Sequence, residues 1–198
     1  MNIKEEFREF LRESPMDTDI ISYTNLRNKI QNMLKYYEFD INNSEHLQEI
    51  GKNIYLFTSL AKDSFDLNSG HQFILYIENK VILGAAMLKK IIINNGHNKV
   101  LAYEILMTTN FTKDKVKGLL YKLYSTFSKK FKAYIVSGDI QSPDSKKIWK
   151  RWLRDKENIS EIFGYHYSTK KFLDYKQISN YWCESEKCKE RRIVVKFK

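Results

Sequence analysis

The sequence predicts an α/β (α+β) fold: a mixed, mostly antiparallel central sheet with helices on both faces, preceded by an N-terminal helical extension. Three observations predict it. Three apolar, β-prone segments between residues 73 and 109 follow one another through short polar turns, which is typical of antiparallel neighbours. A strand, a helix and a second strand follow between residues 103 and 137, which favours a parallel pair joined by a right-handed crossover. Apolar residues spaced three and four apart before residue 62 predict helices ahead of the sheet.

The chain before residue 62 is predicted to form three helices. A short amphipathic helix spans about 3–13, and Ser14-Pro15 ends it. A second helix spans about 20–37. The turn at 42–44 caps a third helix, about 45–62, whose apolar stripe consists of Leu47, Ile50, Ile54, Phe57 and Leu60.

The sheet is predicted to begin with a hairpin. Its strands are 73–77 and 81–93, and its turn is Glu78-Asn79-Lys80. The turn at 94–96 joins the hairpin to a central strand, about 100–109, which the helix after Gly118 and a short strand at 133–136 follow. A basic helix is expected at 143–156, with Trp149 and Trp152 facing inward, and closing strands at 163–175 and 191–197. The connector at 176–190 is not assigned.

Length and composition indicate one folded domain. The chain has 198 residues, of which 42% are hydrophobic and 14% aromatic. We divide it into an N-terminal helical extension, 1–40, and a core, 41–198. The longest apolar run, Val81 to Leu88, is too short to span a bilayer, and the first residues lack the apolar region of a signal peptide. We therefore expect no membrane interaction and a cytoplasmic location.

The charge is basic and unevenly distributed. The net charge is +10, but residues 1–50 carry ten acids against six bases, a local −4, so the remainder carries +14. A basic body is compatible with a nucleic-acid partner and also with a phosphate-bearing cofactor. Cys183 and Cys188 are expected to be free thiols, and no metal site is predicted, because the four histidines show no paired metal spacing.

The stretch from Tyr103 to Phe131 is the most informative. A strand passes through a polar turn with three lysines and one glycine, Gly118, into a helix. Backbone N–H groups and a helix N-terminus can meet an anion at such a place, so the turn is a candidate phosphate site.

Three segments in order resemble the GNAT superfamily of N-acetyltransferases. The segment 115–120, KVKGLL, resembles the family's acyl-CoA-binding motif Arg/Gln-x-x-Gly-x-Gly/Ala, with Lys115 at the first landmark and Leu120 at the last. Upstream, 80–88, KVILGAAML, resembles the family's charged turn and I-V-G-x-x-x-L strand. Downstream, 142–149, SPDSKKIW, has the spacing of the N-x-x-A-x-x-x-Y helix, with Trp149 in place of the tyrosine. The resemblance covers about 72–167.

The resemblance implies a cofactor, acetyl-CoA or another acyl-CoA, and a set of site residues. Main-chain contacts to the pantetheine arm map to Met107, Thr108 and Thr109. Phosphate contacts map to Lys115, Val116, Lys117, Gly118 and Leu119. Glu104, eleven residues before Lys115, lies where some family members have their general base. The general acid of many members corresponds to Trp149, which has no titratable proton, so Tyr121, Tyr124, Tyr165 and Tyr167 are the alternatives.

Two functions of different classes follow. The first is acyl transfer from an acyl-CoA to an amine on a protein, a small molecule or a nucleobase. The second is a GNAT-like binding module without catalysis, for nucleic acid or a protein partner, which Leu120 and Trp149 favour. The acceptor and the oligomeric state are not predicted.

Overall fold

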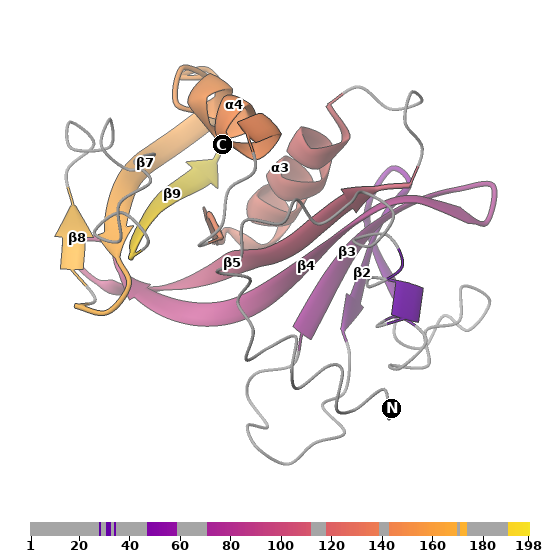
Figure 1. The fold of residues 1–198 in the computed structure, drawn as a ribbon, viewed down its shortest axis with the longest axis horizontal. Helices are drawn as coiled ribbons and strands as arrows, with labels where there is room; N and C mark the ends of the chain where they lie inside the picture. Colours follow the sequence, from indigo (N-terminus) through magenta and orange to yellow (C-terminus); the bar gives the residue numbers. More distant parts are fainter. Residues whose placement is uncertain are drawn as a thin grey trace, which may run out of the picture.

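The computed structural model describes residues 28, 31, 32, 34, 47–58, 71–111, 118–138, 143–169, 171–173 and 190–198. They form a mixed α/β structure around one nine-stranded sheet of order β1-β2-β3-β4-β5-β6-β9-β7-β8 (Figure 1). The first five strands are β1 Leu47–Gly51, β2 Ile54–Thr58, β3 His71–Glu78, β4 Val81–Asn94 and β5 Lys99–Asn110. The others are β6 Tyr134–Val136, β7 Ile159–His166, β8 Lys171–Leu173 and β9 Arg191–Phe197. The helices are α3 Leu119–Phe131 and α4 Pro143–Trp152.

Every neighbouring pair in this sheet is antiparallel except β5–β6, which is parallel. The crossover helix α3 joins these two strands, as the strand–helix–strand pattern predicts. The β3–β4 hairpin, the central strand β5, β6 and β9 lie where the sequence places them. Helix α4 begins where predicted and ends four residues earlier than expected, at Trp152.

The predicted third helix, 45–62, is wrong. The structure has the antiparallel strands β1 and β2 there, with a turn in which Asn53 takes a left-handed conformation, φ 61°. In β2, Ile54 and Leu56 pack into the cluster beneath α3, whereas Phe57 packs into the cluster on the opposite face. Residues that alternate between two buried faces have a period of two, and their apolar stripe also fits a helical spacing.

The two described helices cover the same face of the sheet. Residues of α3 and α4 share one core cluster with β1–β6, β7 and β9, and Phe127, Trp149 and Trp152 lie within it. On the other face, Leu34 is 4% exposed and packs with Phe73 and Met87. The predicted N-terminal helical extension is not supported: positions 28, 31, 32 and 34 are helical, and the rest of 1–40 lies outside the described residues.

The sheet curls so that the β4–β5 turn meets β8. A Cβ added to Gly96, in that turn, would lie 3.4 Å from the ring of Phe172. Phe172 packs on Phe163 of β7, with ring centroids 5.3 Å apart, and Asn95 donates to the Tyr134 hydroxyl at 3.3 Å. The prediction of one continuous strand at 163–175 is wrong. Strands β7 and β8 form a hairpin there, with its turn at 167–169.

None of the helices in the described parts of the chain is long and apolar enough to cross a membrane. The same residues contain no cluster of three or more His, Cys, Asp or Glu side chains suited to a metal ion. Cys183, Cys188 and the unassigned connector up to residue 189 lie outside the described residues.

Candidate functional site

The parallel pairing of β5 with β6 stops halfway along β5. Residues Ala102 to Glu104 pair with Tyr134 to Val136, and β6 ends there. Strand β5 continues to Asn110, and no described residue pairs with this part of β5 on the β6 side. We call the segment from Ile105 to Asn110 the open edge. Backbone N–H and C=O groups along such an edge can form hydrogen bonds with an extended ligand that runs alongside the strand.

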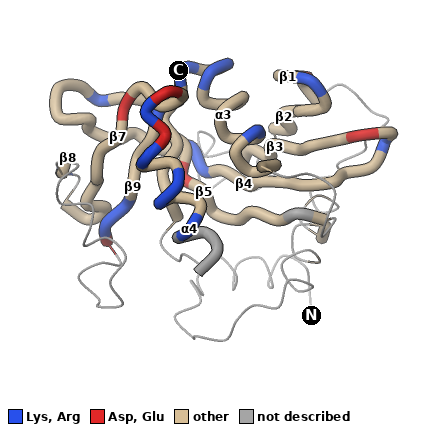
Figure 2. Tube along the Cα trace, turned by 90° about the horizontal axis from the view of Figure 1, so that it is seen from above, with Lys and Arg blue, Asp and Glu red and all other residues tan. Residues whose placement is uncertain are grey.

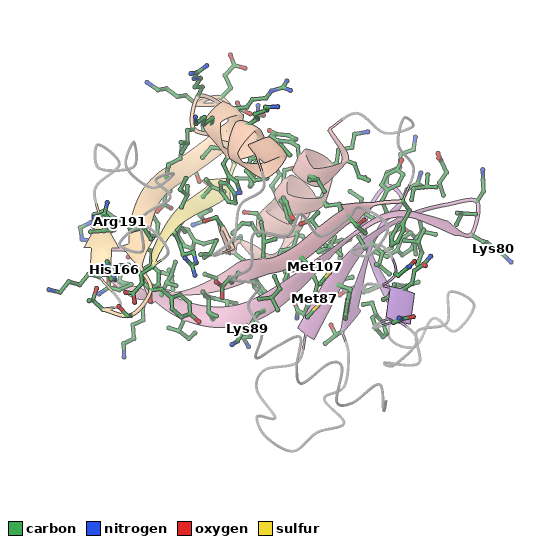
Figure 3. The ribbon with its side chains drawn as sticks, viewed as in Figure 1. Lys80, Met87, Lys89, Met107, His166 and Arg191 are labelled. Carbon is green, nitrogen blue, oxygen red and sulfur yellow. The ribbon has the colours of Figure 1, made fainter. Side chains whose placement is uncertain are left out.

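A β-bulge lies at the start of the open edge. Leu88 of β4 pairs with Ile105, and Met87 pairs with Met107, so Leu106 is an extra residue on β5. Such a bulge bends a strand and increases its local twist. Figure 3 shows Met107 and Met87 close together on these neighbouring strands, below the helical layer. The bulge thereby changes which β5 side chains face α3 just where the β6 pairing is lost.

Helix α3 begins beside this edge, and its N-cap residue is a glycine. Gly118, its N-cap, has φ 71° and ψ 18°, and as a glycine it has no side chain that could cap the helix through a hydrogen bond. Among the described residues, no heavy atom would lie within 4 Å of a Cβ added at Gly118, and the first turn of the helix carries no acid. The N–H groups of the first turn and the positive end of the helix dipole together suit an anion.

The start of α3 lies close against β4. A Cβ at Gly84 would be 2.2 Å from Cδ2 of Leu119, so only glycine permits this contact. Leu119 is 3% exposed, and Leu120 packs against the same core cluster. The bulky Leu120 side chain is therefore part of the core packing of α3.

A neutral hydroxyl pair joins the open edge to α3. The Thr108 and Tyr124 hydroxyls are hydrogen-bonded to each other. Tyr124 is 2% exposed, and its ring packs edge-on against Trp152 with centroids 5.6 Å apart. Burial raises the pKa of Tyr124, and the hydrogen bond from Thr108 opposes that rise in part.

A charged pair lies on the opposite face of β5. Nε of Arg192, on β9, is 3.4 Å from Oε1 of Glu104, and the two residues are 5% and 6% exposed. The Arg192 guanidinium also stacks over the Tyr167 ring, 5.3 Å from its centroid. Strand β6 lies between β5 and β9, and Glu104 pairs with the last residue of β6. The Arg192 side chain therefore contacts Glu104 just beyond the end of β6. Each charge compensates the burial of the other.

The remaining predicted site residues fall into two groups. Thr109 is 2% exposed, and its hydroxyl has no hydrogen-bond partner among the described residues. The first group lies on two neighbouring elements. The open edge contains Met107, Thr108 and Thr109, and α3 starts at Gly118 and Leu119. Lys115, Val116 and Lys117 lie outside the described residues.

Trp149 and Trp152 lie in the core, as the sequence predicts. Each is 2% exposed, and their ring centroids are 4.8 Å apart. Buried rings cannot stack on nucleotide bases. Among the tyrosines considered as proton donors, Tyr124 reaches the open edge, whereas Tyr121 donates to Asp155 at 3.2 Å and Tyr167 lies against Arg192. Burial raises the pKa of Tyr121, and the nearby Asp155 raises it further.

Sequence reasoning missed Arg192. It interprets 191–197 as a closing strand without separating its two faces. Arg192 shares a face with Val194, two residues on, which is fully buried. A charge on the buried face of a strand is the signal that points to a partner such as Glu104.

Comparisons with known proteins add little. No protein-family model matches the chain, and no curated protein does. The solved structure of Arabidopsis thaliana Naa50 in complex with the bisubstrate analogue CoA-Ac-MVNAL is similar over 64% of this chain and 72% of that one. The identity is 16% and the TM-score 0.30, so nothing about this chain's activity follows from that likeness.

Proposed function

We propose that the chain is an acyl-CoA-dependent N-acyltransferase of the GNAT type, with acetyl-CoA as the first donor to test. The single observation that carries the proposal is the combination of the open edge of β5 with a helix that starts at a glycine and is the next described element of the chain. In this proposal the extended arm of the cofactor runs along the open edge, and its phosphates lie at the N-terminus of α3. The resemblance of 72–167 to GNAT motifs supports the same assignment.

Each part of the site has a role in this proposal. The N–H groups after Gly118 bind the pyrophosphate, together with Lys115, Val116, Lys117 and Leu119. The backbone of Met107, Thr108 and Thr109 binds the pantetheine arm along the open edge. An acyl-CoA supplies an activated thioester, whose thiolate leaves readily. Glu104, the residue just before the open edge, accepts the proton of the amine, directly or through water.

Two other side chains assist in this scheme. Arg192 holds the Glu104 carboxylate from the far side, so it is a positioning residue. The Tyr124 hydroxyl, hydrogen-bonded to Thr108 at the open edge, is the tyrosine best placed to return a proton to the leaving thiolate. The acceptor is an amine of a protein, a small molecule or a nucleobase.

The second candidate function is a GNAT-like binding module without catalysis. Two observations favour it. Trp149, at the position of the family's tyrosine, is buried in the core. Glu104 is held in an ion pair with a buried arginine. A module of this kind would bind nucleic acid or a protein partner and would have no acyl-CoA turnover.

Calorimetric titration of acetyl-CoA into the protein tests the proposal. Gly118→Asp and Gly118→Asn form a matched pair, because both residues tolerate a left-handed backbone and have the same shape, but only aspartate adds negative charge. We expect the parent to bind, Gly118→Asn to bind more weakly and Gly118→Asp to lose binding. A folded parent protein that does not bind acetyl-CoA contradicts the proposal. Binding without thiol release across a panel of amines supports the second candidate.

A further inference from the structure

The C-terminal ends of α3, α4 and β9 meet at one edge of the molecule. The backbone N–H of Phe197, on β9, donates to Oγ of Ser128, near the end of α3, at 3.1 Å. The next residue, Lys198, donates its N–H to the carbonyl of Asn158 at 2.9 Å. Its ammonium donates to the carbonyl of Lys156, also at 2.9 Å. Three segments that are distant in sequence are thus tied together by hydrogen bonds.

This edge is strongly basic. Its exposed basic side chains, which we call the basic edge, are Lys129, Lys130, Lys132, Arg154, Lys156 and Lys198. The acids within the same segments are Asp155 and Glu157. Asp155 already accepts hydrogen bonds from Asn158 and Tyr121, so its charge is engaged within the protein. Figure 2 shows blue segments around the C-terminal end of the chain, with red segments beside them.

The basic edge lies at the other end of the sheet from the candidate site. Strands β5 and β6 are parallel, and α3 runs back from the end of β5 to the start of β6. Gly118 and the open edge are therefore at the carboxyl ends of these two strands. Lys132 comes just before β6 begins at Tyr134, at the amino ends. The basic edge is not needed to explain an acyl-CoA site.

Helix dipoles account for only part of this charge. Lys129 and Lys130 are in the last turn of α3, where cations favour the helix C-terminus. Lys132, Lys156 and Lys198 lie beyond the helix ends. Lys196, outside the basic edge, has an acidic partner. Its ammonium is 3.4 Å from Glu161 and lies over the Tyr134 ring, 4.9 Å from the ring centroid. The basic edge has a concentration of like charge that costs stability through self-repulsion.

We propose that the basic edge binds the sugar-phosphate backbone of duplex nucleic acid. Double-stranded DNA carries one negative charge per roughly 1.7 Å of its axis, which complements cations spread over three segments. The tryptophans of α4 are buried, so the surface offers phosphate contacts without their rings for base stacking, which favours a duplex over a single strand. The exposed large apolar residues among those described are Val81, Ile92 and Phe172, all on strands outside the basic edge, so it has no anchor for a membrane.

The test measures duplex binding by fluorescence anisotropy at several salt concentrations. The probe is a labelled 20-base-pair DNA duplex of mixed sequence, with an RNA duplex of the same sequence in parallel. The first variant is Lys129→Gln/Lys130→Gln/Lys156→Gln. The matched control is Lys52→Gln/Lys90→Gln/Lys99→Gln, which removes the same charge from exposed lysines on β1–β2, β4 and β5. Circular dichroism melts verify that both variants fold.

We expect the parent to bind the DNA duplex, with a logarithmic salt slope of about −5 if all six cations engage phosphates. The basic-edge variant should bind roughly tenfold or more weakly at low salt, with a slope reduced by about 3. The control variant should keep most of the parent's affinity for the duplex and most of its salt slope. Equal losses in the two variants would overturn the proposal in favour of general charge attraction. Absent duplex binding, or binding of anionic phosphatidylserine vesicles alone, would also overturn it.

Discussion

The two sides of β5 bury polar groups in different ways at the point where β6 ends. On the side away from α3 and α4, Glu104 and Arg192 form a charged pair between β5 and β9. On the helical side, Thr108 and Tyr124 form a neutral hydroxyl pair between β5 and α3. Both pairs attach β5 to another element at or beyond the last residue that β6 covers.

The two pairs should differ in how much stability the protein loses when one partner is removed. A buried charge without its partner is strongly destabilising, because the remaining ion cannot recover its hydration. A hydroxyl without its partner loses only a hydrogen bond and its desolvation free energy. The charged pair should therefore be the sensitive side of the site and the hydroxyl pair the tolerant one.

Glu104→Gln should have the largest effect if the charged pair also serves in catalysis. The amide keeps the size of the side chain but cannot accept the amine's proton, so kcat should fall about 10²–10⁴-fold with a smaller change in KM. Thiol release from acetyl-CoA with an amine acceptor measures this. An unchanged kcat in a folded variant would restrict Glu104 to a structural role.

Arg192→Met should be the most destabilising single change at the pair. It removes the Arg192 guanidinium from beside the buried Glu104 carboxylate, at a cost of about 3–5 kcal/mol in the free energy of unfolding. Urea unfolding followed by circular dichroism measures the loss. Glu104→Met/Arg192→Met removes both charges and should recover most of the stability; a single variant as stable as the parent would refute the charged-pair interpretation.

Thr108→Val should have a smaller effect. Valine has nearly the shape of threonine but leaves the buried Tyr124 hydroxyl unsatisfied, which costs about 1–3 kcal/mol. Tyr124→Phe should cost less, because Thr108 is only partly buried and can bond to water. The same urea experiment measures both, and the reverse order of the two costs would count against this assignment.

Alkaline pH should reveal the hydroxyl pair and leave the charged pair unaffected. The pKa of Tyr124 is raised above 10.0 in the folded state by burial, so its contribution is complete below that pH and is lost as the pH rises toward the folded value. Unfolding free energies between pH 8 and 11 should decline less steeply in Tyr124→Phe. Some decline should persist, because Tyr103, Tyr134 and Tyr165 are shifted in the same direction. Identical slopes in both proteins would contradict the prediction.

The strands joined by short turns and the crossover helix could be predicted from sequence because their signals are local. The hairpin turn at 78–80 and the glycine before α3 mark element ends directly. The 45–62 segment could not, because its apolar positions fit both a helix and two strands buried on both faces. The β7–β8 hairpin was missed because its turn, 167–169, contains neither glycine nor proline.

The candidate site was predictable only in part. Gly118 and Thr108 could be proposed from sequence because they lie in one continuous motif-bearing stretch. The Glu104–Arg192 pair spans 88 positions, and no local pattern joins residues so far apart. The bulge at Leu106 and the early end of β6 depend on how the strands pair, which a single sequence does not state.

The place of β9 in the sheet has a consequence for folding. Strands β1 to β5 each pair with their neighbour in sequence, so their contacts can form early and locally. Strand β9 lies between β6 and β7, although both precede it in the chain. Before β9 joins the sheet, no strand connects β6 to β7, and Arg192 cannot pair with Glu104. We expect the ion pair and the boundary of the candidate site to form in the last, slow step of folding.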